Sequence, residues 1–402
     1  MNYCSCVKTG LLIFLLFAFS SSQAAAQPIE RPPQALSAAI KNMLDFADSS
    51  RDIELDIDLI PHLLDFVDTP KQLGEAFPLD EPEKVASDYY EFTINRSFAE
   101  VVDLVYNPEL PPFLTQPSSV RRSHWIEING QSQPFPALGP EHIDPKTPLI
   151  VKGVEFIENC PSRDAGSYYA YQLERALILT MHQGRRVLIS ISTQPNKSQV
   201  GKKGLVLGDE TEWNFLYTGE TGTTLPGLGW ADTFIYDSAA IMVYYEAKDS
   251  RQQVKCGVLN WLNAGWLGMN FVQPRHVRRG LVRFADDFRA IMESPKLPAL
   301  SELVKIFQGI NALPINELRA KSRDYFDHLQ RHYRHDDPKY DKWFAKLFTD
   351  QTYLESLNRE EMQALISFEY LKCLMGKPHY PDTACFAASI AQKDPSVPGI
   401  RQ

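Results

Sequence analysis

Histidines and carboxylates gather near residue 330, where they raise the question of a metal site. His328, His332 and His335 are followed directly by Asp336 and Asp337. On one continuous helix the outer histidines would lie about 10 Å apart along the axis, so one ion could use two neighbouring histidines but not all three. Two ligands without a third make a weak site. We therefore interpret the group as a polar helix end and predict no metal.

The sequence lacks the motifs of common hydrolases, nucleotide-binding proteins and zinc proteases. Gly-x-Ser-x-Gly, Gly-x-x-x-x-Gly-Lys and His-Glu-x-x-His are all absent. The glycine-rich stretch Thr218–Trp230 has neither the lysine nor the helix of a phosphate cradle, so we interpret it as a surface loop that could cover a cavity. His124, Glu174 or Asp237 could act as an acid or a base in such a cavity. No catalytic residue and no cofactor is predicted.

Arg175 is the most informative charged residue, because it falls on the apolar face of a predicted strand with Tyr171, Leu173 and Leu177. A charge in that position must be paired, turned outward by a bulge, or directed at an anionic ligand group. We favour pairing with a carboxylate, and ligand recognition is the alternative.

An abrupt change of period marks the start of the unit that would position these side chains. Residues 90–95 alternate between apolar and polar, which predicts a half-buried strand. Ser97 and Glu100 then match a capping box, so a helix begins there. Asn107 and Pro108 end that helix after about three turns.

The centre of the chain is predicted to form a mostly antiparallel sheet, because its strands are joined by connections too short for parallel crossovers. The strands are expected at 124–128, 149–157, 169–181, 187–191, 233–247 and 254–262. A helix over 274–292, with proline in its first turn and a stripe of apolar residues, should cover this sheet.

The N-terminus has the pattern of a secretory signal peptide over residues 1–26, with a short charged end, an apolar run and small residues before a polar start. An uncleaved anchor is the alternative. Cleavage would place the mature protein in a secreted or periplasmic location, where disulfides form. Residues 27–85 are expected to be mainly helical, although Ile53–Leu59 alternates as a strand does.

The cysteines after the signal peptide are Cys160, Cys256, Cys373 and Cys385. Four cysteines allow three pairings. Cys373 and Cys385 are near in sequence, which leaves Cys160 and Cys256 as the complementary pair. Buried free thiols are the alternative, and the absence of Cys-x-x-Cys argues against a zinc ribbon.

The composition is that of a soluble globular protein of two or three compact units. The 402 residues are 44% hydrophobic and 23% charged, with a formal net charge of -9. This acidity argues against nucleic acid as a partner. The basic pairs at 121–122, 185–186, 202–203 and 278–279 could contact a membrane surface, but scattered pairs on solvated turns are the expected interpretation.

The order of these elements resembles the START or helix-grip superfamily. The stretch Phe92–Pro108 is similar to the opening strand and first helix of that family, and the resemblance covers residues 86–295. It implies an α+β fold in which a curved antiparallel sheet is gripped by a long C-terminal helix. An N-terminal helical segment precedes this domain, and an all-helical domain over 296–402 follows it.

The resemblance implies a cavity for a hydrophobic or lipid-like small molecule between the sheet and the closing helix. The candidate ligand-binding residues are Tyr169, Tyr171, Leu173, Arg175, Leu177, Leu281, Phe284 and Phe288. Ordinary core packing is the alternative for each of them.

Three functions remain open at this point. The leading hypothesis is an exported protein that binds a hydrophobic or amphipathic ligand in lipid handling. The alternatives are an enzyme that acts in the same cavity, and a helical interaction protein whose central domain is a scaffold.

Overall fold

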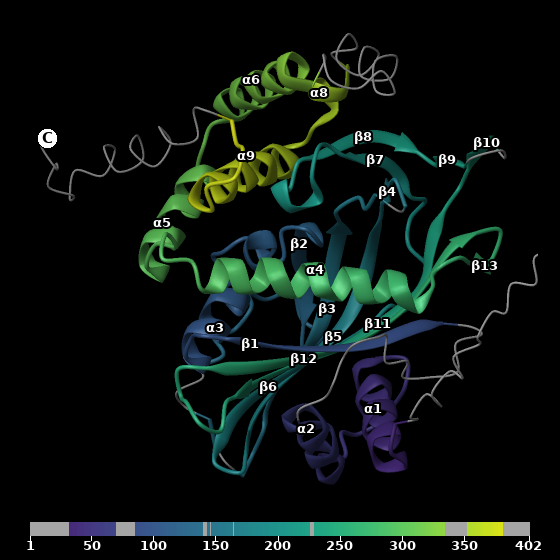
Figure 1. The fold of residues 1–402 in the computed structure, drawn as a ribbon, viewed down its shortest axis with the longest axis vertical. Coiled ribbons are helices and arrows are strands. Elements are labelled where there is room, and N and C mark those ends of the chain that lie inside the picture. The colour runs from purple at the N-terminus through teal and green to yellow at the C-terminus, as the bar shows by residue number, and fades with distance from the viewer. Residues whose placement is uncertain are drawn as a thin grey trace, which may run out of the picture. The chain divides into compact units, whose positions relative to one another are not determined.

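The protein is described by a computed structural model (Figure 1) that covers residues 32–69, 85–139, 143–144, 146–163, 165–225, 229–333 and 352–380. The predicted signal peptide, His335, Asp336, Asp337 and Cys385 lie outside these residues. No helix among the described residues is long and apolar enough to span a bilayer.

An eight-stranded antiparallel sheet forms the centre of the fold, which confirms the predicted α+β class and the antiparallel pairing. The strand order is β1-β12-β11-β6-β5-β3-β2, and β13 pairs with the end of β12. The strands are β1 (Ala86–Ile94), β2 (Val120–Ile128), β3 (Leu149–Asn159), β5 (Ala170–His182), β6 (Arg185–Thr193), β11 (Phe234–Glu246), β12 (Val254–Trp266) and β13 (Met269–Asn270).

The predicted local signals account for several of these elements. β5 and β6 form the expected hairpin, in which His182 pairs with Arg185. After β1, the hydroxyl of Ser97 accepts from the Glu100 amide, and the Glu100 carboxylate accepts from the Ser97 amide 3.1 Å away. This capping box starts α3 (Phe98–Tyr106), as predicted.

One face of the sheet is covered by α4 (Pro274–Met292), which follows β13 and runs along β1. Phe288 of α4 is fully buried, and its ring centroid lies 6.0 Å from that of Phe92 on β1 and 6.1 Å from that of Tyr244 on β11. Leu177 and Leu281 belong to the same buried cluster. The side chains of α4 and the sheet thus form a shared core.

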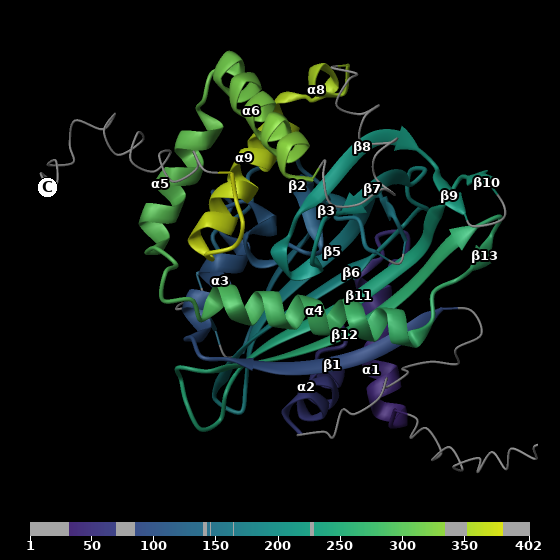
Figure 2. The same ribbon diagram turned by 45° about the horizontal axis from the view of Figure 1, so that its top comes forward.

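The opposite face of the sheet is covered by α1 (Gln34–Ala47) and α2 (Ile60–Asp68) (Figure 2). Their apolar residues share a second core with even-numbered residues of β5 and with β6, β11 and β12. At Gly257 a Cβ would lie 2.8 Å from a methyl group of Val67, so this glycine lets α2 approach the sheet closely.

Two sequence-based expectations were wrong. The alternating stretch Ile53–Leu59 forms no strand, although the segment around it is mainly helical as expected: η1 (Ile57–Leu59) is a short 3-10 turn, in which the Asp56 carboxylate accepts from the Asp58 backbone amide, and α2 begins at Ile60 with Pro61 in its first turn. The stretch Thr218–Trp230 is not simply a loop, because its described residues contribute to strands. These belong to two small sheets made of β4 (Ser167–Tyr168), β7 (Lys202–Val206) and β8 (Phe215–Thr221), and of β9 (Thr223–Leu225) and β10 (Gly229–Ala231).

The chain after α4 is helical where it is described, as predicted. The helices are α5 (Leu300–Asn311), α6 (Ile315–Tyr333), α8 (Thr352–Ser356) and α9 (Arg359–Leu374). α9 contacts α5, α6 and β2, and its buried Met362 and Leu371 belong to the same core as the α4 face of the sheet. The described residues between Pro32 and Tyr380 belong to one compact unit.

The core between α4 and the sheet can be tested by replacing the buried Phe288 and, as a control, the exposed Phe271. Phe288→Ala should lower the free energy of unfolding by about 3–5 kcal/mol, because it leaves a cavity among aromatic rings. Phe271→Ala should cost less than about 1 kcal/mol, since Phe271 is 49% exposed. Urea unfolding of both variants measures the difference. If both variants lost the same free energy of unfolding, this would contradict a core between α4 and the sheet.

Candidate functional site

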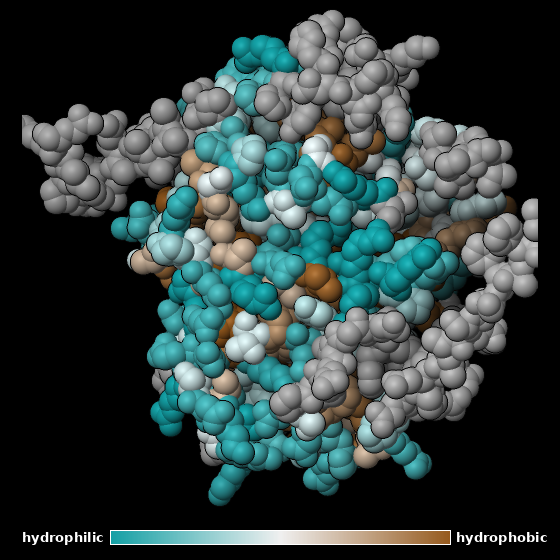
Figure 3. All heavy atoms as spheres, viewed as in Figure 1, coloured by the Kyte–Doolittle hydropathy of each residue, from teal (hydrophilic) through white to brown (hydrophobic). Residues whose placement is uncertain are grey.

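A cavity of about 40 Å³ lies where β8 meets α6 and α9. Its walls are aromatic and aliphatic side chains, and Arg121, Glu361 and Glu369 are the charged residues that line it. Figure 3 shows hydrophobic residues at the surface over the region between α9 and β8. The apolar lining consists of Trp213, Phe215, Leu216, Tyr217, Tyr325, Phe326, Leu357, Ala364, Leu365 and Phe368.

The sheet of β7 and β8 reaches α6 through its apolar residues. Leu207 and Leu216 pack with Tyr325 and Leu329 in a buried cluster. Trp213, just before β8, has a positive φ of 58°, and its indole nitrogen donates to the Asp287 carboxylate of α4 at 3.0 Å. This hydrogen bond fixes the start of β8 against α4. Burial raises the pKa of Asp287, although hydrogen bonds partly offset the rise.

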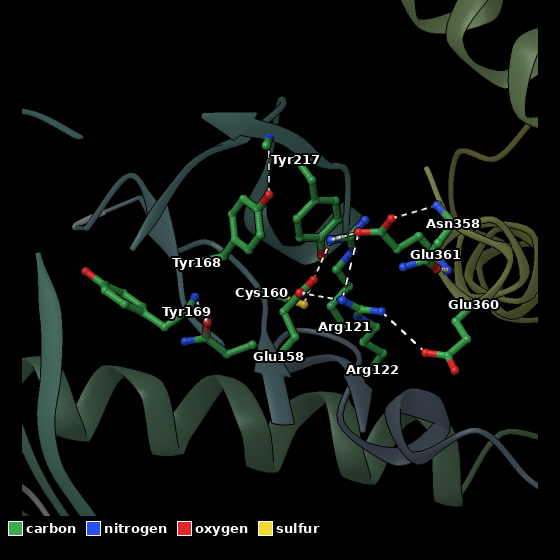
Figure 4. A network of polar contacts seen from close by, with 12 residues as sticks. Arg121, Arg122, Glu158, Cys160, Tyr168, Tyr169, Tyr217, Asn358, Glu360 and Glu361 are labelled. Carbon is green, nitrogen blue, oxygen red and sulfur yellow. Dashed lines mark hydrogen bonds and ion pairs between the residues drawn. The ribbon is translucent and has the colours of Figure 1, made fainter. Parts of the chain in front are cut away.

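Arg121 at the cavity is part of a buried ion-pair network (Figure 4). It pairs with Glu158 of β3 and lies 3.6 Å from a carboxylate oxygen of Glu361 on α9. Arg122 lies 3.0 Å from Glu158 and 3.5 Å from Glu360. Burial would raise the pKa of Glu158, but the charges of Arg121 and Arg122 hold it below its usual range. Glu158 is therefore an ionised carboxylate with only 1% of its surface exposed.

Aromatic rings support the guanidinium group of Arg121. The Arg121 Cζ lies 3.9 Å from the ring centroid of Tyr217 and 5.7 Å from that of Tyr168. Those two rings meet edge to face, with centroids 5.0 Å apart. Burial raises the pKa of Tyr168 to about 12, so this ring carries no negative charge at neutral pH. The arginine is thus held by both cation–π contacts and ion pairs.

Glu361 has two roles at the start of α9. Its carboxylate accepts from the Asn358 amide at 3.0 Å, and the Asn358 side chain accepts from the Glu361 amide at 2.9 Å. The same carboxylate faces Arg121. The capping box of α9 is therefore also the contact that ties this helix to the sheet.

A second buried pair lies at the other side of the cavity. The Lys372 ammonium donates to Glu369 at 2.7 Å and to the Asn214 side chain at 2.6 Å. Lys372 and Glu369 are both nearly inaccessible to solvent. The pair satisfies the charge of Glu369, so the cavity presents no uncompensated carboxylate from this side.

The expectation that basic pairs occupy solvated turns was wrong. Arg121 and Arg122 lie in β2, Arg185 and Arg186 begin β6, and Arg278 lies on α4. They are paired with carboxylates: Arg185 with Asp68 at 2.8 Å, Arg186 with Glu246 at 2.7 Å, and Arg278 with Asp88 at 2.7 Å. A sequence shows the basic pairs but not the distant acids that complete them.

The predicted pairing of Arg175 with a carboxylate is confirmed. Its Nε donates to Glu155 of β3 at 2.6 Å, and its terminal nitrogen donates to the Ser190 hydroxyl at 2.9 Å. Tyr171 and Leu173 lie on the same strand. Burial raises the pKa of Tyr171 to about 12.

The remaining predicted ligand residues lie at different places. Leu177, Leu281, Phe284 and Phe288 come together in the core under α4. Tyr169 donates from its hydroxyl to Thr233 at 3.1 Å, and Figure 4 shows it directed away from Arg121. None of the eight predicted residues lines the cavity beside Arg121. Their role in ligand binding stays a prediction.

The proposed acid and base residues are not brought together. His124 is exposed on β2 and stacks on Phe156, with ring centroids 5.1 Å apart. Glu174 on β5 accepts from the Ser49 amide at 2.9 Å, beside α1. Asp237 lies on β11. No group of three or more potential metal ligands occurs among the described residues.

The predicted pairing of Cys160 with Cys256 was wrong, because both are buried free thiols. Cys160 follows β3 and Cys256 lies in β12, and β11, β6 and β5 separate these strands. That separation is about 19 Å, whereas the Cα atoms of a disulfide lie about 4.4–6.8 Å apart. Cys373 is also free. The alternative of free thiols therefore holds for these three cysteines.

Comparisons with known proteins supply little further guidance. No protein-family model matches this chain, and no match was found among curated proteins. Among solved structures, the human StarD13 (DLC2) lipid transfer and protein localization domain is similar over 60% of this chain and 99% of that domain, with 11% sequence identity and a TM-score of 0.25. A TM-score this low carries no argument about function.

The Glu158 network generates a pH-dependent prediction. Glu158→Gln should lower the free energy of unfolding at pH 7 by about 3–5 kcal/mol, because it removes the closest charge partner of both guanidinium groups. The folded pKa of Glu158 is lowered from 4.5, so this stabilisation is present above pH 4.5 and is lost as the pH falls through the folded pKa. The difference in the free energy of unfolding between the wild type and Glu158→Gln should therefore become smaller in acid.

Glu360→Gln is the matched control for this experiment. Glu360 also pairs with Arg122, but its side chain is 66% exposed. Its loss should cost less than about 1 kcal/mol at any pH. Chemical denaturation at several pH values measures both variants. If the difference in the free energy of unfolding between the wild type and Glu158→Gln stayed constant down to pH 3, Glu158 would not be an ionised carboxylate at neutral pH.

The cysteines can be tested by alkylation. Burial raises the pKa of Cys160 to about 12 and that of Cys256 well above its usual value. Iodoacetamide at pH 8 should therefore leave both unmodified in the native protein. Denaturation without a reductant should expose both to modification, as peptide mapping would show. Protection that persisted until a reductant was added would indicate a disulfide.

Proposed function

We propose that this protein is an exported, START-like binding protein for a hydrophobic or amphipathic small molecule. The observation that carries the proposal is the cavity between β8, α6 and α9, where an apolar lining meets one buried arginine and two carboxylates. Concave apolar surfaces with few polar groups are the usual form of small-molecule sites.

The charges at the cavity favour an uncharged ligand. Arg121 faces Glu361 across 3.6 Å, and Glu369 is paired with Lys372. The nearby Arg122 shares Glu158 with Arg121 and reaches Glu360. Because each cation at this cavity already faces a carboxylate, an anionic head group would have to displace one of them. A neutral ligand avoids that cost.

The size of the cavity limits how much of a ligand it can hold. A buried water needs about 10–15 Å³, so the volume of about 40 Å³ has room for about three water-sized groups. That is enough for the end of a hydrocarbon chain or a small ring. The remainder of a longer ligand would lie outside, along the surface between α9 and β8.

A titration with the neutral apolar dye N-phenyl-1-naphthylamine tests this proposal. Ala364→Trp should weaken dye binding by about tenfold or more, because the indole would fill the space beside Phe368. Ala320→Trp is the matched control, since Ala320 is exposed on α6. Dye fluorescence measures the affinity of each variant.

The outcomes separate the possible ligand locations. Binding lost in Ala364→Trp and kept in Ala320→Trp supports the cavity. Equal binding in both variants would contradict it and direct the search to Arg175 and the residues under α4. In parallel, native mass spectrometry of protein purified from its own compartment should detect an apolar molecule. If native mass spectrometry detected no bound molecule and the protein also failed to bind the dye, the proposed ligand-binding function would be wrong.

A further inference from the structure

Large apolar side chains are exposed at the turn between β12 and β13. In the six residues from Trp266 to Phe271, Leu267 is 78% exposed, Phe271 49% and Met269 46%. The rings of Trp266 and Phe271 stack with centroids 5.5 Å apart and an angle of only 6° between their planes. Figure 3 shows hydrophobic residues at the edge of the molecule where Figure 1 places β13.

The backbone of this turn is unfavourable for the residue that it exposes most. Leu267 and Gly268 have positive φ angles of 51° and 75°, as a two-residue hairpin of type I′ requires. Asparagine and glycine adopt such angles readily, whereas a leucine does so rarely. The turn therefore accepts strain and also presents a leucine to water. Backbone strain of this kind is a reason to look for a function.

The turn extends past the neighbouring strands. The pairing of β1 with β12 ends at Leu262, and beyond it the edge of β12 pairs with β13 instead. The Gly268 amide donates to the Tyr236 hydroxyl of β11 at 2.8 Å, which holds the turn in place. Leu267, Met269 and Phe271 are thus presented by a firmly hydrogen-bonded hairpin.

Cations lie on the segments that flank this turn. Arg275 is exposed in the first turn of α4, which starts three residues after Phe271. The Lys197 ammonium lies 4.5 Å from the ring centroid of Phe234, and Phe234 pairs with Gly265 beside the turn. Asp232, two residues before β11, and Asp237 within β11 are exposed acids of the neighbouring strand region. The charges are mixed, so burial of the apolar residues must supply most of any attraction.

We propose that the β12–β13 turn inserts Leu267, Met269 and Phe271 into the surface of a phospholipid bilayer. Aromatic and aliphatic side chains bind at the boundary between head groups and acyl chains. Arg275 and Lys197 then lie where they can contact the lipid phosphates. A narrow turn with one dominant leucine fits a deformable lipid surface better than a flat protein partner. This surface is separate from the cavity, so it does not depend on the proposed ligand.

Vesicle flotation of the intact protein tests this inference. Vesicles of phosphatidylcholine alone, and with about 30% phosphatidylglycerol, should both bind the wild-type protein, the anionic vesicles more strongly. Leu267→Asn should bind about tenfold more weakly, because one leucine no longer enters the lipid. Its unfolding midpoint should equal or exceed that of the wild type, since asparagine suits a positive φ.

Matched variants keep the result unambiguous. Leu149→Asn alters another leucine, 44% exposed at the start of β3, and should bind vesicles as the wild type does. Ala364→Trp, at the cavity, should also bind them normally. Absence of wild-type binding to both vesicles, or equal binding by Leu267→Asn, would overturn the inference. A wild-type dimer that Leu267→Asn dissociates, without vesicle binding, would assign the turn to a second copy of the chain.

Discussion

The buried carboxylate of Glu158 is the charge on which the arrangement of the sheet and the C-terminal helices depends. It lies between Arg121 and Arg122, and these arginines reach Glu361 and Glu360 at the start of α9. A buried charge that loses its partner costs several kcal/mol. β2, β3 and α9 are therefore held together, and the stacking of Arg121 on Tyr217 brings β8 to the same place. These contacts hold Arg121, β8 and α9 at the cavity, and α6 completes its lining.

The two faces of the sheet serve different purposes. The face under α1 and α2 has a core of aliphatic and aromatic residues, and the Arg185–Asp68 ion pair also joins β6 to α2. The face under α4 carries the aromatic cluster around Phe288, and α4 also binds Trp213 through Asp287. α4 thus connects the central sheet to the small sheet that forms one wall of the cavity. The helix that the resemblance assigns to a ligand grip contributes here to positioning β8.

Local patterns in the sequence were sufficient where the interactions are themselves local. The capping box at Ser97, the hairpin turn after His182 and the apolar stripe of the 274–292 helix each involve residues a few positions apart. Arg175 was also interpreted correctly, because burial physics requires a carboxylate even when its position is unknown.

The candidate site could not be predicted in the same way, because its parts are far apart in the chain. Arg121 needs Glu158 and Glu361, and no periodicity links these positions. The strands β7 to β10 are short, so their pairing depends on tertiary contacts rather than on alternation. The same limit applies to Cys160 and Cys256, whose separation follows from strand order alone.

The helices α1 and α2 make the central domain less modular than its boundaries in the sequence suggest. Four fully buried isoleucines of the sheet lie beneath these two helices: Ile178, Ile189, Ile191 and Ile241. Gly257 has no side chain, which leaves room for Val67 of α2. A fragment that began at β1 would present this row of isoleucines to solvent. Residues 34–68 therefore keep this apolar surface out of water, and any excised form of the sheet domain must carry them.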